Sequence, residues 1–242
     1  MNRYVSVFLL ALRSTVYKIA GVLLLMAGAE GVLFWMQLQR TGGNKIVLLE
    51  EIIQSSGIPL VSGGAFLLVC VILSLVGCEL SGSRVRYTIQ RLSVREEAVV
   101  ILWGVNSMLA LYIFWAVQLG IVLLLSKLYI DIMEPVYFNS QTLFLAFHSS
   151  GFLHSLLPLE ETSRLLRNVA LIFSLGITAS CFAQKQRRGQ RGVAVVLLAA
   201  LTIIFFSSDL GLLGSDITIS VIALATAAFS LYSIFRVELY QE

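Results

Sequence analysis

Residues 78–128 read CELSGSRVRYTIQRLSVREEAVVILWGVNSMLALYIFWAVQLGIVLLLSKL, a charged segment followed directly by a long apolar one. The charged part contains Arg84, Arg86, Arg91, Arg95, Glu96 and Glu97. The hydrocarbon core of a bilayer is about 30 Å thick, and a helix needs roughly 20 apolar residues to cross it. The run Ala98–Leu128 is long for one crossing and too short for two with a turn. It therefore predicts one tilted helix that projects beyond the bilayer.

The composition of the whole chain places it among integral membrane proteins. Of its 242 residues, 58% are hydrophobic and 13% are charged, and the mean hydropathy is +0.89. These values lie far outside the usage of soluble domains. We predict an all-α, polytopic membrane protein with one domain over residues 1–242 and six transmembrane helices. The apolar runs are Tyr17–Met36, Pro59–Gly77, Ala98–Leu128, Leu165–Gln184, Gly192–Ser208 and Ile217–Phe235.

The distribution of Lys and Arg predicts the orientation, because cationic loops are retained in the cytoplasm. With the N-terminus inside, twelve of the 17 cationic residues are cytoplasmic: Arg3, Arg13, Lys18, Arg84, Arg86, Arg91, Arg95, Lys185, Arg187, Arg188, Arg191 and Arg236. A seventh crossing through residues 141–159 would move the basic segment 185–191 outside, so the charge distribution rejects it. We therefore expect a multi-pass protein of the cell membrane, of the bacterial plasma membrane type, with both termini in the cytoplasm.

Two segments outside the apolar runs have helical patterns. Residues 2–15 place Val5, Phe8, Leu9 and Leu12 on one helical face, which predicts an interfacial helix that leads into the first span. The alternative is an extension of that span. In the outer loop 129–161, Ser149-Ser150-Gly151 predicts a break between two short helices, and Pro158 predicts the end of the second. This loop could act as a lid or simply pack on the bundle.

The residues needed for catalysis are not arranged for it. His148 and His154 are the only histidines, and both lie in the outer loop rather than beside a nucleophile in a span. Glu160-Glu161 has Arg164 one place too early for the Glu-Glu-x-x-x-Arg pattern of prenyl-protease-like membrane enzymes. Cys70, Cys78 and Cys181 suit small apolar positions, and no phosphate-binding Gly-x-x-x-x-Gly-Lys-Ser/Thr motif occurs. We expect no enzyme activity, metal, cofactor or nucleic-acid partner for this chain.

Three polar residues interrupt the predicted spans. Glu30 is an ionisable residue within an apolar run, where such residues are costly. Gln118 lies at a similar depth in the third span, and Asn106 lies deeper. They predict either the lining of a translocation path or hydrogen bonds at a helix interface, which the small residues Ala27 and Gly31 would favour.

The charged segment and the topology together resemble the permease subunit of a type-2 ABC exporter. In that family an acidic residue closes the second span, a Gly-Ser/Thr pair and a short coupling helix follow, and a Leu-Pro-Val-Ser-Arg-like turn enters the third span. Here those places are filled by Glu79, Gly82-Ser83, residues 84–91 and Leu92-Ser93-Val94-Arg95. The turn lacks its proline. The loop between the last two spans, residues 207–216, is too short for the family's outer helical hairpin.

The resemblance implies half of an export path that pairs with a second copy or a related permease. Cytosolic ABC ATPase subunits would bind the ATP and Mg²⁺, and membrane lipid would surround the spans. The coupling helix would use Arg84, Arg86, Tyr87, Ile89 and Arg91, with Val85, Ile89 and Leu92 as its apolar stripe. Ser93 and Glu96 have the spacing of a helix capping box. Alternatively, the arginines follow the positive-inside bias and contact anionic lipid.

Two other functional classes remain open from the sequence. The chain could be a membrane anchor or an immunity protein that binds a partner without transporting anything. An intramembrane enzyme is the third class. An ATPase that copurifies with the chain would favour the exporter.

Overall fold

The structure is a computed structural model, and it describes residues 3–41, 48–76, 95–132, 140–158, 161–187, 189–190, 192–206 and 213–239. These residues form helices and contain no strand. The helices are α1 (Arg3–Thr41), α2 (Leu49–Ser55), α3 (Ile58–Ser74), α5 (Glu96–Ile132), α6 (Ser140–Ser149), α7 (Gly151–Leu156), α8 (Thr162–Arg187), α9 (Ala194–Phe206) and α10 (Leu213–Leu239). The predicted all-α fold class is confirmed.

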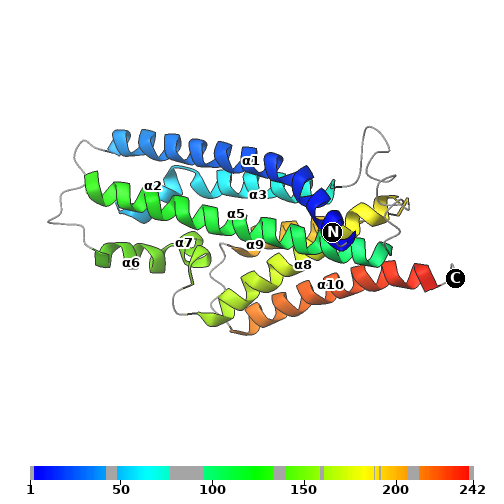
Figure 1. The fold of residues 1–242 in the computed structure, drawn as a ribbon. Helices are drawn as coiled ribbons and strands as arrows, with labels where there is room; N and C mark the ends of the chain where they lie inside the picture. The colour runs from blue at the N-terminus through cyan, green and yellow to red at the C-terminus, as the bar shows by residue number, and fades with distance from the viewer. Residues whose placement is uncertain are drawn as a thin grey trace.

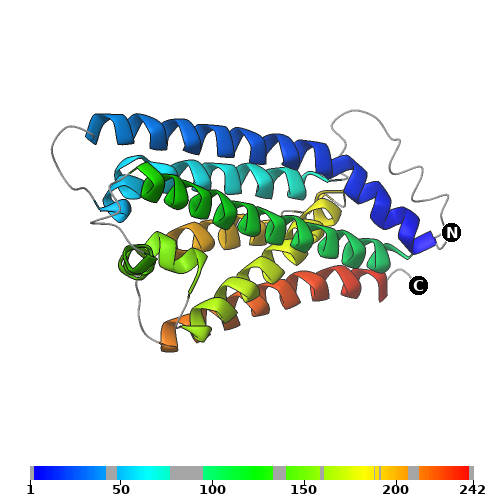
Figure 2. The ribbon, with the colours of Figure 1, turned by 60° about the vertical axis from the view of Figure 1, so that its left-hand side comes forward.

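The long helices lie side by side in a bundle (Figures 1 and 2). The most extensive packing joins α8 to α10 and to α5, while α1 packs on both α5 and α3. Apart from the short connecting helices, each helix runs opposite to the one before it (Figure 2). The end of α3 and the start of α5 consequently lie at the same end of the bundle as the first residues of α1 and the last residues of α10.

Among the residues that the structure describes, four helices are long and apolar enough to cross a membrane: α1, α5, α8 and α10. The pair α2 and α3 makes a fifth candidate, bent by 53°. The bend lies at Gly57, whose φ of 77° is a left-handed conformation that glycine adopts readily, and Pro59 follows in the first turn of α3. The predicted fifth span, Gly192–Ser208, appears as α9, whose 13 residues rise about 20 Å, less than the apolar thickness of a bilayer.

The predicted interfacial helix does not form a separate element, because α1 runs without interruption from Arg3 to Thr41. No glycine or proline precedes Gly21, so nothing in the sequence ends the helix earlier. The first part of α1 bends away from the rest (Figures 1 and 2). The hydroxyls of Ser14 and Thr15 donate to the carbonyl oxygen of Ala11, at 2.8 and 3.0 Å, and such bonds bend helices.

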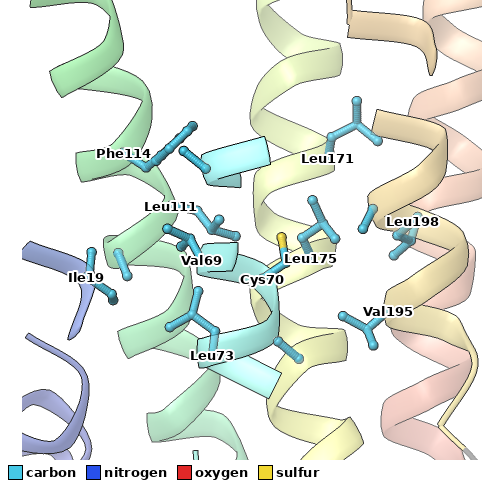
Figure 3. Packing of buried hydrophobic residues seen from close by; sticks show 14 of the residues in the cluster. Ile19, Val69, Cys70, Leu73, Leu111, Phe114, Leu171, Leu175, Val195 and Leu198 are labelled. Atoms are coloured by element: carbon cyan, nitrogen blue, oxygen red, sulfur yellow. The ribbon is translucent and has the colours of Figure 1, made fainter. Parts of the chain in front are cut away.

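The helix predicted over residues 98–128 is confirmed as α5, one uninterrupted helix of 37 residues and about 55 Å. Its Trp103, Leu111, Phe114 and Val122 are buried. Leu111 and Phe114 meet Val69, Cys70 and Leu73 from α3 in the main apolar cluster, to which α8 and α9 also contribute (Figure 3). Cys70 and Cys181 are buried and form no disulfide, which is consistent with the small apolar positions predicted for them.

The two short helices predicted in the outer loop are also confirmed. The break between α6 and α7 falls at Ser150, and α7 ends before Pro158. Phe147, Leu153 and Leu156 are buried in a second apolar cluster together with residues of α1, α2, α3 and α5. The loop helices are therefore packed onto the bundle through their apolar side chains.

Candidate functional site

Glu30 of α1 and Gln118 of α5 form a buried polar pair. The side-chain amide of Gln118 donates from Nε2 to both carboxylate oxygens of Glu30, at 3.0 and 3.1 Å. Glu30 has no exposed surface and Gln118 is 1% exposed. Glu30 follows Met26 and precedes Phe34 at a spacing of four, so the three side chains share the face of α1 that meets the bundle. Glu30 thus faces protein.

Asn106 lies apart from this pair. It is twelve positions before Gln118 on the same helix, a separation of about 18 Å along the axis. Its Nδ2 atom is 3.5 Å from the hydroxyl oxygen of Thr15 in α1, a long hydrogen bond between buried groups. Both polar contacts therefore lie between α1 and α5, which is the helix-interface alternative that the sequence left open.

The residues predicted to contact an ATPase, namely Arg84, Arg86, Tyr87, Ile89 and Arg91, lie outside the described residues, as does Ser93 of the predicted capping box. The described neighbour Glu96 is the first residue of α5. Its carboxylate accepts a hydrogen bond from Nε2 of Gln184 in α8. The start of α5 is in this way joined to the end of α8.

An ion pair that the sequence did not predict joins α8 to α10. Nη1 of Arg167 is 2.8 Å from Oδ1 of Asp216, and the hydroxyl of Ser163 donates to Oδ2 of Asp216 at 3.2 Å. Arg167 is 1% exposed and Asp216 is 6% exposed. Arg167 lies near the start of the predicted run Leu165–Gln184, and Asp216 lies at the end of the predicted loop 207–216. The sequence does contain a signal for this pair. Arg167 and Asp216 lie at the starts of two predicted spans, and the predicted topology puts both starts on the same side of the membrane.

A second polar group lies close by. Nε of Arg164 is 2.9 Å from Oε2 of Glu161, and Nε2 of His154 is 3.7 Å from the same oxygen. The rings of His154 and His148 meet edge to face, with centroids 5.8 Å apart. Across the described ranges, no three histidine, cysteine or acidic side chains are grouped as a metal site would need.

A pocket of about 160 Å³ lies between α3, α5, α7, α8 and α9, and we call it the aromatic pocket. Its aromatic residues are Phe66, Phe114, Trp115, Phe152 and Phe206, and its polar residues are Ser62, Gln118, Asn168 and Thr202. Gln118 therefore contacts Glu30 and also lines the pocket. Gln118 is recognisable from the sequence as a polar residue within a span, whereas the aromatic residues of the pocket come from four separate helices and no local pattern groups them.

Hydrogen bonds to the backbone of α7 hold one side of the aromatic pocket. The indole Nε1 of Trp115 donates to the carbonyl oxygen of Leu156 at 3.1 Å. Nδ2 of Asn168 donates to the carbonyl oxygen of Ser155 at 2.8 Å. The short helix α7 is thereby attached to α5 and α8 at the same time.

Comparison of the chain with protein-family models, with curated proteins and with solved structures gave no match, so no activity can be transferred to it from a relative.

Proposed function

We propose that this chain is the transmembrane subunit of an ATP-driven exporter and supplies half of the translocation path. It would pair with a second copy or a related permease. Cytosolic ABC ATPase subunits would bind the ATP and Mg²⁺ and drive transport. The chain itself would carry out no catalysis, and it would lie in the cell membrane with both termini in the cytoplasm.

One observation carries the proposal: the basic segment that resembles a coupling helix connects two helices at the end of the bundle where the chain also begins and ends. Residues 77–94 join α3 to α5. Arg95 follows this segment, and Arg236 lies in the last turn of α10 at the same end (Figure 1). A cytoplasmic ATPase would therefore meet the basic segment and both termini on one face.

The outer cations support the same orientation. Arg164 and Arg167 are two of the five cations that the proposed orientation places outside, and each is beside an acidic side chain, Glu161 and Asp216 respectively. Their positive charge is balanced within the fold. The excess of positive charge then belongs to the other end of the bundle, which is the arrangement expected of a cytoplasmic face.

The packing within one chain favours a path formed between two chains. Glu30, Asn106 and Gln118 are each at most 2% exposed, and they face one another or Thr15 between α1 and α5. A polar substrate would find no continuous polar lining along these residues. We therefore assign to these three residues the close contact of α1 with α5, and we place the path at the interface with a second permease. In this topology α9 is the fifth of six crossings and the shortest.

Copurification from native membranes tests the proposal. A tagged chain extracted in mild detergent should bring with it an ATPase subunit, identified by mass spectrometry and by ATP hydrolysis. Replacing Tyr87 and Ile89 together by Asp should abolish this association while membrane insertion survives. The matched control replaces Ser83 and Gln90 by Asp, which adds the same charge but removes no apolar side chain. If neither the native chain nor the control retains an ATPase, the exporter function is wrong.

A further inference from the structure

We propose that the aromatic pocket binds a small lipophilic molecule that carries an aromatic ring and one hydrogen-bond donor, such as a phenolic hydroxyl. This inference concerns binding by the chain itself. It deepens the proposed function, because such a molecule would be a substrate or a regulator of an exporter, but binding does not require an ATPase.

The walls of the aromatic pocket suit a ring. Phe66 and Phe114 meet with centroids 6.0 Å apart and their planes tilted by 54°. Phe152 and Phe206 form a second pair with centroids 6.1 Å apart and planes at 67°. Rings in such tilted arrangements accept another aromatic ring against an edge or a face. A cavity of about 150 Å³ is large enough to bind benzene. The volume of the aromatic pocket, about 160 Å³, is close to that value.

Two buried acceptors in the pocket lining specify the polar group of the ligand. Gln118 uses its Nε2 on Glu30, and its Oε1 has no hydrogen-bond partner in the described ranges. Asn168 uses its Nδ2 on Ser155, and its Oδ1 likewise has no donor among those residues. Gln118 is 1% exposed and Asn168 is 3% exposed. Burial of an acceptor without a donor is unfavourable, so both carbonyl oxygens favour a ligand that donates.

Simpler occupants satisfy only part of this lining. A lipid acyl chain would cover the apolar wall but would leave both carbonyl oxygens without a donor. A water molecule would satisfy a carbonyl oxygen but would leave the phenylalanine rings uncovered. A phenol supplies the ring together with a donor for one of the two carbonyl oxygens. Access is available beside α9, where Ile203 lines the pocket and is 37% exposed.

Quenching of tryptophan fluorescence tests the proposal on the purified chain. The chain has three tryptophans, and replacing Trp35 and Trp103 by Phe leaves Trp115 in the pocket wall as the single reporter. 4-Bromophenol should quench Trp115 saturably. 4-Bromoanisole has the same ring but no donor, and it should bind about five- to tenfold more weakly, as expected for one lost hydrogen bond.

Two adjacent glycines provide a matched pair of variants. Gly63 lines the pocket, and a Cβ atom added there meets no other atom within 4 Å. A side chain can therefore start from this position in the pocket wall, and Gly63→Leu should occupy the pocket and remove the saturable quenching. Gly64 also has open space around a Cβ atom, but it is exposed and does not line the pocket. Gly64→Leu should leave bromophenol binding unchanged.

Trp103 is buried, so replacing it by Phe could itself disturb the fold. A second measurement therefore uses the chain with all three of its tryptophans. 4-Bromophenol should raise its apparent unfolding temperature, and Gly63→Leu should abolish that rise. Equal, unsaturable quenching by both probes would show partition into detergent and overturn the proposal. Equal saturable binding would also overturn it, because the occupant would then need no donor. If bromophenol binds but no ATPase copurifies with the chain, the ligand-binding proposal stands and the exporter function is wrong.

Discussion

Glu30 shows how a single buried carboxylate positions two long helices. Both of its oxygens accept from Nε2 of Gln118, and both side chains are buried. Polar contacts of this kind between membrane helices are modest individually. They nevertheless select one rotation and one axial register for α1 against α5, because the alternative leaves polar groups unpaired in apolar surroundings.

Replacing Glu30 tests this role. Glu30→Gln should keep a hydrogen bond to Gln118 and preserve folding. Glu30→Leu should destabilise the chain by about 1–3 kcal/mol, because the Gln118 amide would remain buried without an acceptor. Thermal unfolding in detergent measures both. The double variant with Leu at positions 30 and 118 should recover part of the loss, and additive losses would show that the two residues do not interact.

Gly176 is a second residue on which packing depends, at the contact between α8 and α5. A Cβ atom built there would lie 2.4 Å from Cγ of Met108 and 2.8 Å from its backbone nitrogen. The backbone cannot move away as a flexible side chain would, so Gly176→Ala should cost about 1–3 kcal/mol. Gly120→Ala is the control, since its Cβ atom would meet nothing within 4 Å. Equal unfolding temperatures for the two variants would contradict the close approach.

At the scale of elements, the ion pair of Arg167 with Asp216 joins α8 to α10, the two helices that share the most extensive contact. The side chains are 1% and 9% exposed. Removing one partner leaves the other charge buried, which typically costs about 3–5 kcal/mol. The neighbouring pair, Arg164 with Glu161, differs because the Glu161 side chain is 39% exposed and solvent screens its charge.

We therefore expect Asp216→Asn to lower stability markedly and to loosen the packing of α8 on α10. Glu161→Gln should lower it less than Asp216→Asn does, because solvent already screens the carboxylate of Glu161. Unfolding temperature and protease sensitivity in detergent report both effects. Replacing Arg167 and Asp216 together by Leu should cost less than Asp216→Asn alone, because no buried charge would remain. If the double variant is less stable than Asp216→Asn, the loss of stability in Asp216→Asn does not come from a buried unpaired charge.

For the whole molecule, the alternating helix directions predict which loops share a side of the membrane. Gln190 and Gln141 are both exposed and lie at opposite ends of the bundle, after α8 and in α6. Gln190 is preferable to Gly189, whose φ of 69° disfavours any other residue. In a chain without Cys70, Cys78 and Cys181, a cysteine at 190 should react with an impermeant reagent only from the cytoplasm, and one at 141 only from outside.

Labelling of both cysteines from the same side would end the six-crossing topology. It would mean that the chain crosses the membrane an even number of times between positions 141 and 190, as in the seventh crossing through residues 141–159 that the charge distribution rejects. Permeabilised cells are the control, because both positions should then react fully.

The sequence by itself determined the features that depend on local pattern. Apolar runs and their lengths predicted the long helix α5 and the membrane class, and Ser149-Ser150-Gly151 with Pro158 predicted where α6 and α7 begin and end. These succeed because backbone hydrogen bonds within a helix, and their interruption by helix-breaking residues, involve neighbours in the chain. The prediction of a separate interfacial helix over residues 2–15 was not confirmed. No helix-breaking residue precedes Gly21, so the backbone hydrogen bonds of α1 continue through this region.

Tertiary structure alone decided which polar residues meet. Glu30 and Gln118 are 88 positions apart, and Arg167 and Asp216 are 49 apart. The aromatic pocket collects rings from α3, α5, α7 and α9. A membrane helix can rotate and slide against a neighbour with little change in its own hydrophobic pattern, so that pattern does not specify partners. The choice is made by close packing at small residues such as Gly176 and by the requirement that buried polar groups find one another.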